Sequence, residues 1–322
     1  MQSIKRFFTT PVILVVLATI FGFAFADLVL FSGCDDGIDI AFCQKMGIVN
    51  VFNTVPLFLI WVTLAILFTG LATAIGIISL KSILEMRREY KIAGKDIAAI
   101  FILTLAMGVA GMGFIFKLKD FSNSAQHFYV WPVSPLKNQD VKLFVIFAYN
   151  TAMSALGVAG MIVTGIVASR ETAKKITPET VLDYFKLKRR LTNLLLMSGV
   201  VLSSGVIIVY LLYVIVSSIN VQHSKMFDPD CAILFGLLFT LFVSASYMPA
   251  KFLLNGLGRA IKSSYIGEPP LQLEPDLKKW FDNKAAVEKY LELEVTATSA
   301  TLQLMPILAP ILTSVIPHLF RH

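Results

Sequence analysis

Side chains that could carry out catalysis are few in this chain and lie far apart in the sequence. The four histidines are at positions 127, 223, 318 and 322, and the one adjacent acid pair, Asp35 with Asp36, fits a solvated turn. HExxH, GxSxG and Walker-type motifs do not occur, nor does a Cys/His spacing that suits a metal. We therefore expect a protein that is not an enzyme and that uses no metal or cofactor.

Polar side chains inside apolar runs are the remaining candidates for chemistry. Asn150 and Ser154 are one helical turn apart in "FAYNTAMSALG", so they share one face of a helix. They fit two roles: lining a solute pathway, or bonding a neighbouring helix, which contributes about 0.6 kcal/mol per contact. Asp27 is an acid within an apolar run and is either a proton or cation site or a residue at headgroup depth. These three are the candidate pathway-lining residues.

The elements that must position these residues are long apolar runs. Apolar residues make up 56% of the chain and the mean hydropathy is +0.75, which gives more apolar surface than one soluble core buries. A bilayer core needs roughly 20 apolar residues per helix, whereas a β-barrel would show short alternating strands. The sequence predicts an all-α transmembrane bundle within residues 10–250, with six spans near residues 10–31, 51–80, 97–116, 143–168, 191–216 and 232–249.

Lysine and arginine gather in alternate connections between these runs. One group extends from Lys81 to Lys95, and a larger one extends from Arg170 to Arg190. Because short cytoplasmic loops retain cations, we place these connections and the C-terminal linker in the cytoplasm. The membrane is then the plasma membrane, which is the inner membrane if the source is bacterial. The net charge of +7 is explained by topology, and nucleic acid is not an expected partner.

The N-terminal run fits two interpretations. Residues 1–26 have a basic start, an apolar stretch and the sequence "AFA", which is the pattern of a cleaved signal peptide. Apolar residues resume at once in "LVLF", which favours an uncleaved first span. Just beyond, Cys34 and Cys43 can form a disulfide on the outer side if the compartment is oxidising, with Cys231 free or replacing one of them.

A short pattern occurs twice, as "AMGVAGM" in the third run and "ALGVAGM" in the fourth. Small side chains at positions i and i+4 let helix backbones approach closely, which is a main source of helix cohesion in lipid. We predict that both copies are helix-packing surfaces; a functional inverted repeat of the transporter type is the alternative. The residues concerned are Ala106, Gly108, Ala110, Gly111, Ala155, Gly157, Ala159 and Gly160.

The C-terminal quarter differs in composition from the rest. Residues 251–274 contain Gly, Ser and paired prolines, which predict a cytoplasmic linker. Residues 275–322 predict an amphipathic helix that starts at Pro275, followed by an apolar stretch with three prolines. That stretch fits a pore or re-entrant element, a seventh span, or a helix that seals an oligomer. We expect an embedded, kinked helix, broken by Pro306, Pro310 and Pro317.

Two functional classes agree with these features. The small-residue faces, the Asn150 and Ser154 pair and the proline-broken stretch favour a channel or transport component that acts as an oligomer. The lack of a charged residue at midplane favours a nonconducting subunit that docks partners in a larger membrane complex. We expect the first class. The expected partners are the lipid bilayer and either further copies of this chain or other membrane-complex subunits.

Overall fold

A computed structural model of the chain describes residues 16–25, 56–118, 139–219, 230–266, 276–291 and 297–319. Every regular element in these ranges is a helix, which confirms the predicted all-α class for this part of the chain. The helices are the Val16–Phe25 helix, α5 (Pro56–Glu89), α6 (Gly94–Leu118), α8 (Gln139–Thr172), α9 (Pro178–Ile219), α10 (Asp230–Ile266), α11 (Asp276–Tyr290) and α12 (Ala297–Leu319).

Four of these helices contain a segment that is long and apolar enough to cross a membrane. They are α5, α8, α9 and α10, with the segments Thr63–Tyr90, Val145–Thr172, Pro178–Leu211 and Ala232–Ile266. By length and composition, these four helices are compatible with the predicted helical membrane protein. The first and third apolar runs also contain helix, in residues 16–25 and in α6, but neither is among the four, so the count of six spans stays a prediction.

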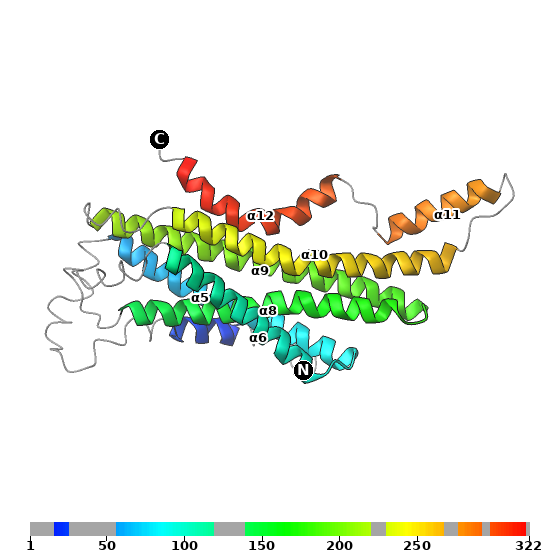
Figure 1. Cartoon of the computed structure of the whole chain (residues 1–322), viewed down its shortest axis with the longest axis horizontal. Coiled ribbons are helices and arrows are strands. Elements are labelled where there is room, and N and C mark those ends of the chain that lie inside the picture. Colours follow the sequence, from blue (N-terminus) through cyan, green and yellow to red (C-terminus); the bar gives the residue numbers. More distant parts are fainter. Residues whose placement is uncertain are drawn as a thin grey trace, which may run out of the picture.

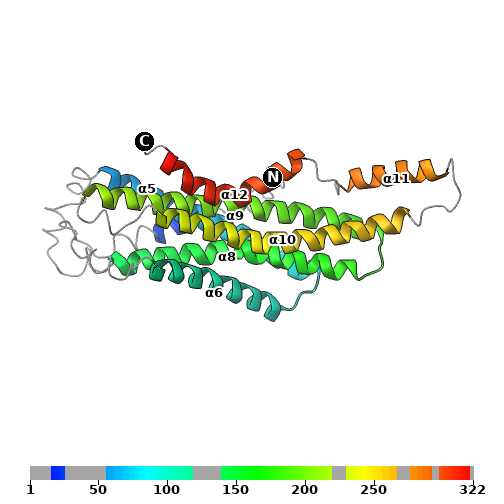
Figure 2. The ribbon, with the colours of Figure 1, turned by 45° about the horizontal axis from the view of Figure 1, so that its top comes forward.

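α8 lies at the centre of the bundle. It contacts α5, α6, α9 and α10, and Figure 1 shows these helices running together along the long axis. α6 lies at the edge of the bundle beside α8 (Figure 2). One stripe of α6 is turned inward and has the spacing of a helical face, namely Phe101, Thr104, Leu105 and Gly108. The opposite side of α6 is exposed at Ile102, Leu103, Ala106, Met107, Val109 and Ala110.

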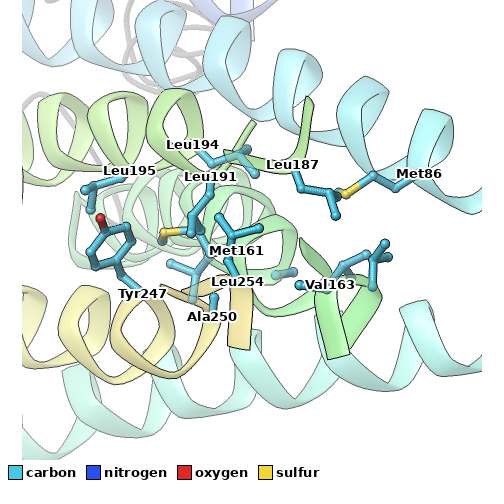
Figure 3. Packing of buried hydrophobic residues seen from close by; sticks show 14 of the residues in the cluster. Met86, Met161, Val163, Leu187, Leu191, Leu194, Leu195, Tyr247, Ala250 and Leu254 are labelled. Carbon is cyan, nitrogen blue, oxygen red and sulfur yellow. The ribbon is translucent and has the colours of Figure 1, made fainter. Parts of the chain in front are cut away.

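The largest core cluster joins α8, α9 and α10. Met161 packs with Leu191, Tyr247 and Leu254 in Figure 3, and all four side chains are buried. α9 has 42 residues, so at 1.5 Å per residue it is about 63 Å long, roughly twice the thickness of the bilayer core. The bundle therefore extends well beyond the hydrocarbon region.

The helices also extend further than the sequence pattern predicts. α9 begins at Pro178, so most of the basic segment from Arg170 to Arg190 is helical and residues 173–177 alone connect α8 with α9. α10 continues through Pro249, and residues 251–266 of the expected linker are helical. The reason is packing, because three side chains of this part are buried in the core, and this outweighs the low helix propensity of nearby Gly and Ser: Leu254, Leu257 and Ile261.

Polar contacts join the helices at the end of the bundle where α9 begins. Arg190 donates to Glu89 of α5 through both terminal nitrogens, at 2.7 and 3.1 Å; such bidentate pairs have a defined geometry. The Tyr184 hydroxyl donates to the Leu291 carbonyl at 3.0 Å, just after the last residue of α11. The predicted amphipathic helix therefore lies near this end of the bundle, where Figure 1 shows it beyond the other helices.

α12 is a helix that is bent in both views and packs across α9 and α10 (Figures 1 and 2). Pro310 has no backbone N–H, so it cannot bond the carbonyl of Pro306 one turn earlier. That carbonyl oxygen lies against Gly199 of α9, where an added methyl would be 2.7 Å from it. The Pro310 carbonyl oxygen lies in the same way against Gly236 of α10, 2.8 Å from an added methyl. Gly199 and Gly236 thus leave room for the backbone of α12 at Pro306 and Pro310.

Candidate functional site

A row of small residues lies along one buried face of α8. Asn150, Ser154, Gly157 and Thr164 follow at intervals of four, three and seven positions, which places them above one another on a helix over about 21 Å. Side chains of α5 and α9 meet the same face. We call this set of buried side chains the α8 polar seam: Thr69, Thr73, Ser79, Asn150, Ser154, Thr164 and Ser198.

A hydrogen-bond network joins α5 and α8 at one end of the seam. Asn150 Nδ2 is 3.2 Å from Thr69 Oγ1, and the Thr69 hydroxyl donates to the Ala65 carbonyl at 2.8 Å. The Tyr149 hydroxyl is 2.9 Å from Thr73 Oγ1, and Thr73 donates to the Thr69 carbonyl at 2.6 Å. Because both threonine hydrogens are used on α5, the two α8 side chains must be the donors. This fixes the orientation of the Asn150 amide.

The middle of the seam brings three helices together at Gly157. A methyl added to this glycine would lie 2.5 Å from Ser198 Oγ of α9 and 3.7 Å from Ser79 Oγ of α5. Both hydroxyls are buried, and neither finds a hydrogen-bond partner among the residues that the structure describes. An unpaired buried polar group destabilises a protein by about 1–3 kcal/mol. The two hydroxyls therefore offer favourable hydrogen bonds to any small polar molecule that reaches them.

Two methionines close the other end of the seam. The Thr164 hydroxyl is 2.8 Å from the Gly160 carbonyl and 3.5 Å from Met86 Sδ. Met86 and Met161 are both fully buried, and Met161 lies on the seam face between Gly157 and Thr164. Methionine side chains are flexible and adapt to irregular gaps. The seam is thus blocked here by side chains that can change rotamer.

A cavity of about 50 Å³ lies beside the Asn150 end of the seam, between α5, α6, α8, α9 and α10. A water molecule needs about 10–15 Å³ of such space, so the cavity has room for a few waters or one small molecule. Its walls include five phenylalanines, and its polar residues are Asn150, Thr151 and Ser154. We call it the Asn150 pocket.

One hydrogen-bond acceptor in this pocket is unused. Asn150 is 5% exposed, and its Oδ1 has no hydrogen-bond partner within the described part of the chain. The hydroxyls of Thr151 and Ser154 already donate, to the carbonyls of Phe147 and Asn150 at 2.7 and 2.8 Å. Asn150 therefore contributes a buried acceptor that is unpaired among the described residues, while the hydroxyl hydrogens of Thr151 and Ser154 are already engaged.

The structure brings two of the predicted pathway-lining residues together. Asn150 and Ser154 lie one turn apart on the seam and both line the pocket. Their part in a solute pathway stays a prediction. Asp27 lies outside the described residues, as do Cys34 and Cys43.

The two copies of the repeated pattern lie in different surroundings. In α8 all four small residues are buried, and a methyl added to Gly160 would be 3.0 Å from Leu194. In α6, Gly108 faces α8, with the Thr151 methyl 3.0 Å from an added Cβ, while Ala106 and Ala110 are exposed. Gly111 in α6 and Pro317 in α12 lie beyond the last residues of those helices whose surroundings are described.

Five seam residues are missing from the sequence-based candidates: Thr69, Thr73, Ser79, Thr164 and Ser198. A signal for Thr164 exists, because it continues the Asn150 and Ser154 face at helical spacing. No such signal exists for Ser79 and Ser198, which belong to other helices and meet α8 through the packing at Gly157.

Comparisons with other proteins give no further guide to the site. No protein-family model matches the chain, and no curated protein or solved structure is significantly similar to it. Within the described ranges, no three His, Cys, Asp or Glu side chains lie close enough to hold a metal ion. The function must therefore be argued from the seam and the pocket themselves.

Proposed function

We propose that this chain is a channel or transport component for small uncharged polar solutes, that it acts as an oligomer, and that it has no enzymatic role. The α8 polar seam is the pathway. Its location is the plasma membrane, with the cation-rich ends of α5, α8 and α9 in the cytoplasm, as the placement of lysine and arginine favours.

The observation that supports this proposal is the pair of unpartnered hydroxyls at Gly157. Ser79 and Ser198 are buried in a core where a lone hydroxyl is unfavourable, and a polar solute at this point replaces the missing hydrogen bonds. The seam contains no charged side chain, so an ion would lose its hydration without compensation. Small uncharged solutes fit this chemistry best. Met86 and Met161 must move for passage, which makes them the gate of this proposal.

Reconstitution into liposomes tests the proposal. We expect the purified protein to raise the permeability to water, urea or glycerol above that of protein-free liposomes, with Ser198→Ala lowering the flux several-fold. Ser204→Ala is the matched control on α9, because Ser204 bonds its own Val200 carbonyl at 2.8 Å and is not part of the seam. Permeability equal to that of protein-free liposomes for all three solutes would reject the transport role.

A second candidate function is supported by the outward face of α6. Ala106 and Ala110 form a small-xxx-small pair that is exposed among the described residues, beside the large apolar residues Ile102, Leu103 and Met107. Such a face suits close contact with another membrane helix. The chain would then be a nonconducting subunit that docks a partner. This role predicts no solute flux in liposomes that contain the purified protein. It also predicts that specific membrane proteins co-purify with the chain, and that the double variant Ala106→Leu with Ala110→Leu loses them.

A further inference from the structure

We propose that the Val16–Phe25 helix stays in the mature protein as a member of the bundle, packed on α5, and is not removed as part of a signal peptide. The sequence of residues 1–26 fits both outcomes. The contacts of this helix with α5 and α8 favour retention, because they are the close contacts that join helices inside a membrane protein. The inference does not depend on the transport role.

One face of the Val16–Phe25 helix is buried and carries small residues. Ala18 is 5% exposed, and Gly22, one helical turn later, is also buried. Residues four positions apart share a face, so these two form a small-xxx-small pair that is turned into the bundle. Large apolar side chains on the other face are exposed among the described residues: Val16, Leu17, Ile20 and Phe21. This pattern suits a helix between the bundle and lipid.

The Val16–Phe25 helix, dark blue in Figure 1, crosses α5 with glycine against glycine. A methyl added to Gly22 would lie 2.9 Å from the Gly70 Cα and 2.9 Å from the Thr69 carbonyl oxygen. Both are backbone atoms, which cannot rotate away as a side chain can. In the other direction, a methyl added to Gly70 would overlap the Phe23 ring. The crossing therefore has room for glycine at both positions.

The same helix covers a hydrogen bond between α5 and α8. A methyl added to Gly22 would lie 2.5 Å from Thr73 Oγ1, the oxygen that is bonded to the Tyr149 hydroxyl. The Phe25 ring packs on the Tyr149 ring, with centroids 4.5 Å apart. Removal of the helix would uncover this polar contact on the side of the bundle, where lipid offers no hydrogen bonds. The helix thus protects the Asn150 end of the α8 polar seam.

The motif that indicates cleavage lies within this packed region. Phe25 is the middle residue of "AFA", and Ala24 and Phe25 are both helical. A signal peptide has an apolar stretch of about 7–15 residues, whereas this apolar run extends from Pro11 to Phe31 with Asp27 as its one charged residue. The run has the roughly 20 residues that a spanning helix needs. Its length therefore agrees with the contacts.

The mass of the mature chain tests retention directly. The full chain, with a C-terminal affinity tag, is produced in bacteria and purified from their membranes, and its intact mass is measured. We expect a chain that still contains residues 16–25. The control is a secretory protein that loses its signal peptide in the same cells. A mature chain that lacks residues 16–25 would overturn the inference.

Two leucine substitutions test the packing on α5. Gly22→Leu places a large side chain in the crossing with Gly70, and we expect the unfolding temperature in one detergent to fall by about 5 °C. Ile20→Leu is the matched control, because Ile20 is 55% exposed on the same helix; we expect a shift within about 1 °C. Gly22→Ala gives the same comparison, with a smaller shift, if the leucine variant does not accumulate.

Equal unfolding temperatures of the Gly22 variants and the control would reject the packing on α5. They are also the result expected if the helix were absent from the mature protein, because a residue that has been removed cannot change its stability. Neither measurement involves solute flux, so failure of this inference and failure of the transport role are distinguishable.

Discussion

The two copies of one short pattern, "AMGVAGM" in α6 and "ALGVAGM" in α8, have nearly the same sequence and different structural roles. In α8, Ala155, Gly157, Ala159 and Gly160 are all buried. In α6, Ala106 and Ala110 are exposed, and Gly108 is turned toward α8. α8 is surrounded by four helices, whereas α6 lies at the edge of the bundle. The number of neighbouring helices, rather than the pattern, decides whether small residues form a contact.

The two copies also differ in how their small residues contribute to contacts between helices. Around α8, Gly157 lets α9 approach so closely that the Ser198 hydroxyl lies 2.5 Å from where a side chain would begin. On α6, the same small residues form an apolar surface that is exposed among the described residues, of the kind that suits contact with another membrane helix. The following predictions test this contrast, beginning with the largest effect.

The first prediction compares a leucine in each copy. Ala159→Leu inserts a large side chain at a position with no exposed area, and overpacking of this kind destabilises by about 1–3 kcal/mol. Ala110→Leu lies on an exposed face, and we expect a change within about 0.5 kcal/mol. Thermal unfolding in one detergent measures both. Equal destabilisation would show that the two copies are packed alike.

The second prediction concerns Gly199, a glycine of α9 that lies against α12. Gly199→Ala places a methyl 2.7 Å from the Pro306 carbonyl oxygen, which cannot rotate away as a side chain can. We expect α12 to be displaced, with a loss of about 1–3 kcal/mol and faster hydrogen exchange in residues 304–315. Gly256→Ala is the control, because nothing lies within 4 Å of its added methyl; this variant should be neutral or up to about 1 kcal/mol more stable. Unchanged exchange in α12 of Gly199→Ala would contradict the observed docking.

The third prediction concerns hydrogen bonds between helices. A double-mutant cycle of Tyr149→Phe with Thr73→Val should give a coupling of about 0.6 kcal/mol, the average for such bonds in membranes. Thr104 of α6 is the control, because its hydroxyl bonds the Ile100 carbonyl of its own helix. The cycle of Tyr149→Phe with Thr104→Val should give no coupling. A coupling of the same size in both cycles would mean that the measured value does not report the α5–α8 bond.

The smallest effect is expected at the charged end of the bundle. The Lys262 ammonium, which bonds the Glu288 carboxylate, lowers the pKa of Glu288 below its usual value. A lowered folded-state pKa stabilises the folded arrangement above the unfolded value of about 4.3 and loses this contribution as the pH falls through the folded pKa. We expect hydrogen exchange in α11 to accelerate below about pH 4, while residues 155–160 of α8 remain protected.

Glu288→Gln is the variant for this experiment. The substitution should accelerate hydrogen exchange in α11 at neutral pH. It should also abolish the further acceleration of exchange at low pH. Protection of α11 equal to that of the unmodified chain at pH 7 would show that the Lys262 pair does not hold this helix.

Much of the fold follows from the residues alone, and the candidate site follows in part. The apolar runs predict membrane helices, and the spacing of Asn150 and Ser154 predicts one shared face. Pro306 and Pro310 predict a bent helix with a carbonyl that lacks its partner. The extension of α10 past Pro249 is not predictable in this way, because burial of Leu257 and Ile261 overrides local propensity.

Periodicity and hydropathy are local properties, so the order of the residues is enough to predict apolar helices and polar residues on one face of one of them. Packing between helices sets which copy of the repeated pattern is central, which serines meet Gly157, and which glycines lie against α12. These contacts join residues far apart in the chain, and their energies depend on the distance between helices, which local sequence does not specify.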